Sequence, residues 1–169
     1  MATDPWLIDD RAGPAPAPWR CFTDAVMGGV SAGELVAVQH LGRPALRLRG
    51  RVRTEFNGGF VQMALDLPPP PPGAAALVLD VAGPPDGARS YGLHLRTRTL
   101  TAPWQAWRSR FDVGPAWQTL QLPLAGFTPY RFEGTLVAAD VRRIGLVALA
   151  FDGQPFDAEL YFARAAWSA

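Results

Sequence analysis

Apolar and polar residues alternate with a period of two along much of this chain. The segment 44–53 reads PALRLRGRVR, so an extended strand places Leu46, Leu48 and Val52 on one side and four arginines on the other. A helix would scatter those arginines around its circumference. The alternation therefore predicts a β-strand with one buried face.

The same kind of pattern recurs at short intervals. Further strands are expected at 33–39, 59–65, 91–98, 105–113, 117–122, 144–150 and 156–162. No amphipathic helix of three turns is visible, and the 169 residues include 17 glycines and 17 prolines. The chain is therefore predicted to be all-β, a single-domain β-sandwich or jelly roll over residues 1–169. The prolines at 68–72 cannot donate ladder hydrogen bonds, so they are expected in an extended connection between strands.

Charge and composition restrict the choice of partners and compartment. The formal net charge is +1, and all sixteen basic side chains are arginines, so no global field favours nucleic acid. No apolar run is long enough to span a membrane. The first twenty residues carry acidic groups where a signal peptide needs a basic start, which predicts a cytoplasmic chain. The lone Cys21 excludes an internal disulfide and is expected to be a small buried apolar residue.

The first glycine corner is DAVMGGVS, residues 24–31. The pair Gly28 and Gly29 supplies positive backbone dihedrals and allows close approach by another backbone or a ligand. The corner lacks the Lys and Ser/Thr of a phosphate-binding loop. Asp24 is placed either to cap backbone amides or to give an oxygen to a cation. Both a structural turn and a ligand or partner contact fit this pattern.

The second corner is EFNGGF, residues 55–60. Asn57 followed by Gly58 is a strong hairpin signal, and Phe56 and Phe60 flank it in the manner of core anchors. A tight hairpin is therefore predicted. The alternative is that Asn57 presents its amide to a ligand.

The two corners carry a family resemblance together with the segments that follow them. Those segments are YGLHLR at 91–96, WQAWRSRF at 104–111, AWQTLQLPLAGF at 116–127, RIGLVALAF at 143–151 and PFDAELYFARA at 155–165. In this order they resemble the complex I intermediate-associated protein 30 family. The resemblance runs from about Trp19 to Ala165 and leaves residues 1–18 as a partly extended segment.

The resemblance implies a galactose-binding-like β-sandwich, related in shape to carbohydrate-binding modules. It also implies a part in assembling respiratory NADH:ubiquinone oxidoreductase. The family has no established catalytic residues, so the resemblance assigns only the motif positions to this chain. It implies that these residues shape the fold or face a partner. They are Asp24, Met27, Gly28, Gly29, Ser31, Asn57, Gly58, Gly59 and Phe60.

A cationic and aromatic face is predicted on two further strands. Alternation gives one strand His94, Arg96 and Arg98, and gives the other Trp104, Arg108 and Arg110. If the two strands are neighbours, this face suits a carboxylate, a phosphate or an acidic protein surface. The alternative is an ordinary solvated face on which arginines limit edge aggregation. Arg47, Arg49, Arg51 and Arg53 form a second stripe with the same two interpretations.

The sequence contains few residues whose pattern suggests catalysis or metal binding. The two histidines, His40 and His94, have no sequence-local partners that suggest a triad or a metal cluster. No cofactor is expected, and a structural calcium ion has no residue pattern in its favour. The first hypothesis is a non-enzymatic assembly or chaperone-like factor that binds a protein client, such as subunits of a redox complex. The alternatives are a module that binds a carbohydrate or small anionic ligand and, third, an enzyme that uses His94.

Overall fold

The computed structural model describes residues 4–13 and 16–169, and these residues form strands joined by loops and single-turn 3-10 helices. The strands are β1 (Leu7–Asp9), β2 (Arg20–Thr23), β3 (Ala32–His40), β4 (Arg43–Val52), β5 (Phe60–Asp66), β6 (Ala76–Ala82), β7 (Arg89–Thr97), β8 (Ala106–Val113), β9 (Gln118–Pro123), β10 (Thr128–Tyr130), β11 (Val141–Leu149) and β12 (Phe156–Ser168). The 3-10 helices are η1 (Asp24–Met27), η2 (Glu55–Asn57), η3 (Leu124–Gly126) and η4 (Ala138–Asp140).

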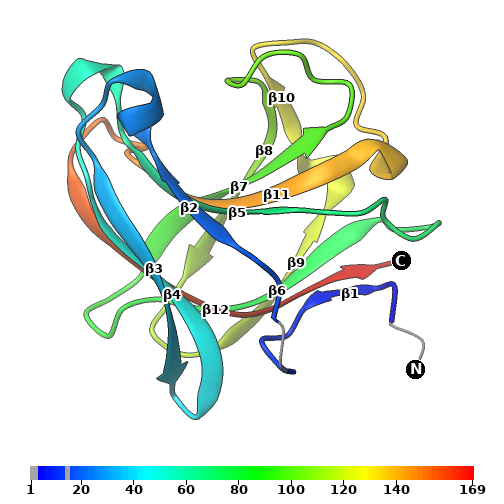
Figure 1. Cartoon of the computed structure of the whole chain (residues 1–169), viewed down its shortest axis with the longest axis horizontal. Helices are drawn as coiled ribbons and strands as arrows, with labels where there is room; N and C mark the ends of the chain where they lie inside the picture. The colour runs from blue at the N-terminus through cyan, green and yellow to red at the C-terminus, as the bar shows by residue number, and fades with distance from the viewer. Residues whose placement is uncertain (1–3, 14–15) are drawn as a thin grey trace.

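Two antiparallel sheets pack face to face (Figure 1). The first sheet has the order β3-β4-β12-β6-β9, and β1 pairs with the C-terminal part of β12. The second sheet has the order β10-β8-β7-β11-β5-β2. The predicted all-β sandwich is confirmed. In the part of the chain that is described, no helix is long and apolar enough to cross a membrane.

The inner faces of both sheets supply one hydrophobic core. Strand β4 follows the predicted alternation, because Leu46, Leu48 and Val52 are all buried. Burial of side chains of this size stabilises the fold by about 1.5–3 kcal/mol each. Tyr91 of β7 links the two sheets: its hydroxyl donates to the backbone carbonyl of Glu159 in β12 at 2.7 Å.

The arginines of the second stripe, three on β4 and Arg53 directly after it, are engaged in ion pairs. The pairs are Arg47 with Glu34, Arg49 with Glu159, Arg51 with Asp157 and Arg53 with Glu55. Each partner lies on a neighbouring strand or two residues along the chain, so the positive charges are neutralised within the protein. This stripe offers little uncompensated charge to a partner.

Candidate functional site

The Asp24 carboxylate joins the two glycine corners. Asp24 begins η1 and is fully buried. Its Oδ1 accepts a hydrogen bond from the Ser31 backbone N–H at 2.9 Å. Its Oδ2 accepts from the Ser31 hydroxyl and from the Gly59 backbone N–H, both at 2.6 Å. The amide-capping interpretation of Asp24 is confirmed, and the corners form one structural unit.

Two glycines leave room for this carboxylate. A Cβ built on Gly29 would lie 2.4 Å from Cγ of Asp24, and one built on Gly58 would lie 2.4 Å from its Oδ2. No side chain fits at either position unless Asp24 moves. Gly29 and Gly58 are therefore explained by close packing around the Asp24 carboxylate. Gly28 and Gly59 instead have φ values of +84° and +137°, so the positive dihedral expected of the first glycine pair is found at Gly28 and not at Gly29.

The second corner is not the tight hairpin that its Asn-Gly sequence predicts. Strand β4 belongs to the first sheet and β5 to the second, so residues 53–59 carry the chain from one sheet to the other. The expectation of a core position for Phe56 is also wrong, because its side chain is 73% exposed and its φ is +59°. Phe60 is only partly buried. The side chain of Asn57 lies outside the described part of the structure.

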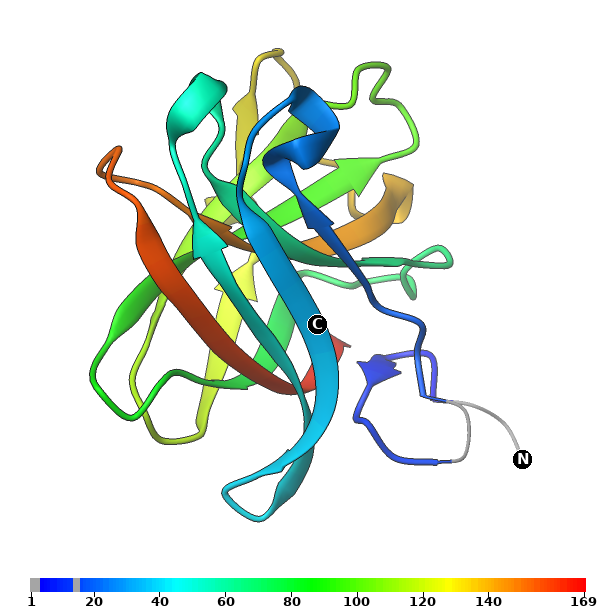
Figure 2. The same ribbon diagram turned by 60° about the vertical axis from the view of Figure 1, so that its left-hand side comes forward.

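An apolar tip projects from the two corners at one end of the sandwich. It consists of Val26, Met27 and Phe56, which are 73%, 58% and 73% exposed. Helices η1 and η2 lie side by side in both Figure 1 and Figure 2. A bulky residue such as Phe is an outlier at positive φ, and such strain concentrates at functional sites. The tip is thus an exposed apolar surface on a base that Asp24 fixes.

The second sheet brings half of the predicted cationic face together. Strands β7 and β8 are neighbours, and His94 lies directly opposite Arg108, with Gly92 opposite Arg110. These side chains are on the outer face of the sheet, away from the core. Raised segments flank this face, with η1 and η2 on one side and the β7–β8 and β10 loops on the other (Figure 1).

The other three predicted residues do not reach this group. Arg96 donates to the backbone carbonyls of Ala102 and Pro103 at 3.0 and 3.2 Å, so it fastens the loop between β7 and β8. Arg98 pairs with Asp140 at 2.7 Å. Trp104 lies in the same loop, before β8 begins, and is 57% exposed.

A cleft of about 520 Å³ opens on the outer face of the second sheet. Its lining includes His94, Arg108, Arg110, Thr128, Leu149 and Phe151. The Arg108 guanidinium carbon lies 3.4 Å from the centre of the Tyr130 ring, and that of Arg110 lies 4.0 Å from the centre of the Phe151 ring. Neither aromatic residue could be predicted from the sequence, because Tyr130 ends a three-residue strand and Phe151 follows a strand, where alternation carries no information.

His94 is uncharged at neutral pH. Its burial, together with the charge of Arg108, lowers the pKa of the imidazole to about 3. Burial also lowers the pKa of Arg108, although a guanidinium stays protonated under ordinary conditions. A hydrogen bond with Arg131, and to a smaller degree the charges of Arg108 and Arg131, lower the pKa of the Tyr130 hydroxyl. The cleft therefore combines positive charge with a neutral imidazole.

Other reactive groups are placed less favourably for chemistry. Within residues 4–13 and 16–169, no group of three or more His, Cys, Asp or Glu side chains is arranged to hold a metal ion. Cys21 is half-buried; burial, and next the charge of Glu34, raise the pKa of its thiol. A protonated thiol is a weak nucleophile.

The fold places this chain among β-sandwiches of the carbohydrate-binding-module type. A family 11 carbohydrate-binding module from Clostridium thermocellum, in complex with a β-1,3-1,4-mixed-linked tetrasaccharide, superposes with a TM-score of 0.76 at 12% identity, over 96% of this chain and 94% of that one. An exo-β-agarase gives a TM-score of 0.62 at 10% identity, over 96% of this chain and 25% of the agarase. A family 30 carbohydrate-binding module gives 0.52 at 16% identity, over 81% and 74%.

Residues 10–161 match the Complex I intermediate-associated protein 30 (CIA30) family, and the chain belongs to that family. The resemblance inferred from the two corners and the later segments is confirmed. No curated protein matches the sequence. The family is associated with the assembly of complex I, and the structural neighbours establish only the shared fold.

Proposed function

We propose that this protein is a non-catalytic assembly factor that binds a protein client, a subunit or subcomplex of a respiratory or other redox complex, through its apolar tip. The observation that carries this proposal is the exposure of Val26, Met27 and Phe56 on the two glycine corners, which lie within the residues that match the family. Clustered exposed apolar side chains are a common mark of a protein-binding surface. Membership in the CIA30 family supports the choice of client.

The construction of the tip suits binding. The buried hydrogen bonds of Asp24 to Ser31 and Gly59 hold the two corners in one arrangement before a partner arrives. A preorganised surface loses less conformational entropy on association, so more of the contact energy appears as affinity. Large apolar anchors such as Phe and Met are enriched where partners meet.

The test is affinity capture of the tagged protein from its own cells, with mass spectrometry of the recovered proteins. We expect the wild-type chain to enrich subunits of a redox complex and the double variant Met27→Ser, Phe56→Ser to lose them. Truncation of an anchor side chain at an interface typically costs about 2 kcal/mol or more, which is roughly a thirtyfold loss of affinity.

A matched control comes from the opposite end of the sandwich. Leu41 is 62% exposed in the turn between β3 and β4, so Leu41→Ser removes a similar exposed apolar side chain without touching the tip. This variant is expected to recover the same subunits as the wild type. Equal recovery by the tip variant, or absence of redox-complex subunits from every sample, would contradict the proposal.

A second candidate function is the binding of a glycan or small ligand in the cleft of the second sheet. The specific observation in its favour is that the cleft joins guanidinium groups to the rings of Tyr130 and Phe151. Aromatic rings and charge-bearing donors of this kind bind sugars and small polar molecules. A glycan and metabolite panel, read by thermal shift, tests this function; no stabilisation by any compound would count against it.

A further inference from the structure

Three arginines beside the cleft have no carboxylate partner. Among the described residues, no Asp or Glu oxygen lies within 4.0 Å of the guanidinium nitrogens of Arg108, Arg110 or Arg131. The contrast with the outer face of the first sheet is direct, because Arg49 and Arg51 there pair with acidic residues of β12. Positive charge is therefore compensated along β4 and left without a carboxylate partner beside the cleft, although Arg98 and Arg143 elsewhere on the second sheet are paired with Asp140 and Asp66.

Aromatic rings hold these arginines in place. Arg108 and Arg131 lie 3.4 and 5.1 Å from the centre of the Tyr130 ring, and Arg110 lies 4.0 Å from that of Phe151. Stacking on a ring orients a guanidinium but uses none of its N–H donors. The charged groups are thus positioned, and because each guanidinium has five N–H donors, donors remain available beyond those that contact the Tyr130 hydroxyl.

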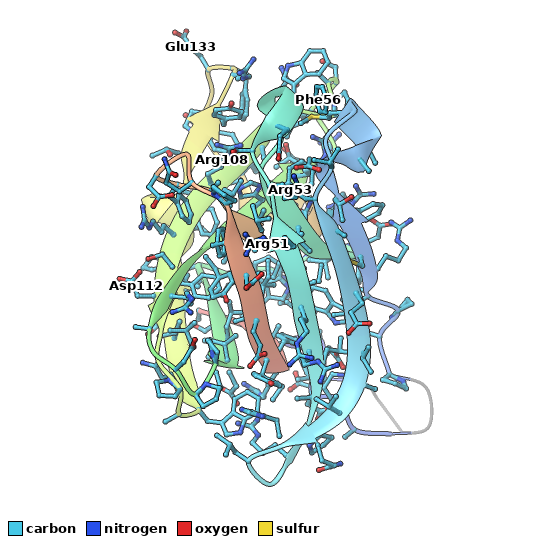
Figure 3. The ribbon with its side chains drawn as sticks, turned by 90° about the vertical axis from the view of Figure 1, so that its left-hand side faces the viewer. Arg51, Arg53, Phe56, Arg108, Asp112 and Glu133 are labelled. Carbon is cyan, nitrogen blue, oxygen red and sulfur yellow. The ribbon has the colours of Figure 1, made fainter. Side chains whose placement is uncertain are left out.

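Nearby carboxylates are directed elsewhere. Asp112 accepts a hydrogen bond from the Ser90 hydroxyl, and Asp152 accepts from the backbone N–H of Gln154 at 3.0 Å. Glu133 projects from the outer end of its loop, away from Arg108 (Figure 3). The acids around the cleft therefore do not neutralise its arginines.

Two polar atoms among the lining residues are also left without a partner. Nε2 of His94 and Nε of Arg108 are out of contact with solvent and have no hydrogen-bond partner in the described structure. An unsatisfied buried N–H donor costs free energy, and a ligand oxygen that accepts its hydrogen bond would remove this cost once the side chain turns toward it. Such orphaned groups at a concave surface favour a binding site over an ordinary solvated strand face.

We infer that the cleft is a binding site for a small organic anion that carries a carboxylate or phosphate group. Arg108 and Arg110 would hold the anionic group, since planar guanidinium donors match the oxygens of either anion. Leu149 and Phe151 supply the apolar wall for the rest of the ligand. A volume of about 520 Å³ lies within the usual range for small-molecule sites.

The test is a titration of the ¹⁵N-labelled full chain, followed by nuclear magnetic resonance, with three probes that share one ring. Glucuronate carries a carboxylate, glucose 6-phosphate carries a phosphate, and glucose carries no charge. We expect one or both anions to shift the backbone signals of β8 and of residues 149–151, and glucose to leave them unchanged at equal concentration. The two anions separate carboxylate from phosphate recognition.

Two variants that change the net charge equally test whether the anions bind in the cleft. Arg110→Gln is expected to weaken anion binding about 10- to 100-fold, because a charge-assisted hydrogen bond contributes about 1.5–3 kcal/mol. Arg51→Gln on the first sheet changes the net charge equally and is expected to leave binding unchanged. Because Arg110 is exposed, its variant is expected to fold even if an Arg108 variant does not.

Three results would overturn this inference. They are absence of binding by both anions at low ionic strength, equal binding of glucose, and equal weakening by Arg51→Gln and Arg110→Gln. The last result would mean general charge attraction, which about 0.15 M salt largely screens. None of them bears on client binding, because Met27 and Phe56 do not line the cleft.

Discussion

Replacing Asp24 by alanine is expected to lower the free energy of unfolding by about 3 to 5 kcal/mol, a large part of the stability of a domain of this size. The carboxylate is fully buried and accepts hydrogen bonds from the Ser31 N–H, the Ser31 hydroxyl and the Gly59 N–H. Its removal leaves both N–H groups buried without an acceptor. It also opens a cavity where the two corners meet.

Urea denaturation at pH 7 measures this loss directly. The control is Asp157→Ala, which removes an exposed carboxylate that pairs with Arg51 on the surface. An exposed ion pair contributes about 0–1 kcal/mol, so the control is expected to unfold close to the wild-type midpoint. Similar losses from both substitutions would show that the bridge between the corners is not a principal source of stability.

The same substitution connects stability to the proposed function. Without Asp24, the buried hydrogen bond between the two corners is lost and only the bonds of Ser31 to the Arg53 backbone still join them, so the apolar tip loses much of its preorganised shape. The variant is therefore expected to lose the client even under conditions where it remains folded. A folded Asp24→Ala chain that retains the client would place the binding surface away from the tip.

Strand positions could be predicted from the sequence wherever one face of a strand is buried and the other is solvated. In 44–53 the alternation of leucine with arginine marks both faces, and β4 covers nearly those residues. Strand β6 was not predicted, because Ala76–Ala82 is buried almost throughout and shows no alternation. The pairing of β4 with β12 joins residues about a hundred positions apart, and no local pattern specifies it.

At the candidate site, short sequence patterns predict the elements but not the contacts between distant residues. Both glycine corners were recognised, but the bond from Asp24 to Gly59 spans 35 positions and depends on the packing of two sheets. Alternation placed His94, Arg108 and Arg110 on the correct strands. It could not show that Arg96 would be used by loop carbonyls, since that depends on the path of the loop after β7.

His94 is expected to make the protein lose stability as the pH falls below about 6.5. In the unfolded chain an imidazole has a pKa of about 6.5, whereas burial beside Arg108 lowers the pKa of His94 to about 3 in the fold. Above pH 6.5 both states are neutral and the stability is complete. Between these two pKa values the unfolded state binds a proton that the folded state does not, so the stability decreases progressively.

At pH 4.5 the loss assigned to His94 is expected to be about 2 to 3 kcal/mol relative to pH 7. The measurement is urea denaturation at both pH values for the wild type and for His94→Gln, which cannot titrate. Carboxylates in ion pairs also weaken on acidification, but they do so equally in both proteins, so the difference between the two losses isolates His94. An equal loss in both proteins would mean that His94 takes up its proton in the fold at about the same pH as in the unfolded chain. In that event the cleft would carry a further positive charge, and anion binding there should strengthen steeply as the pH falls.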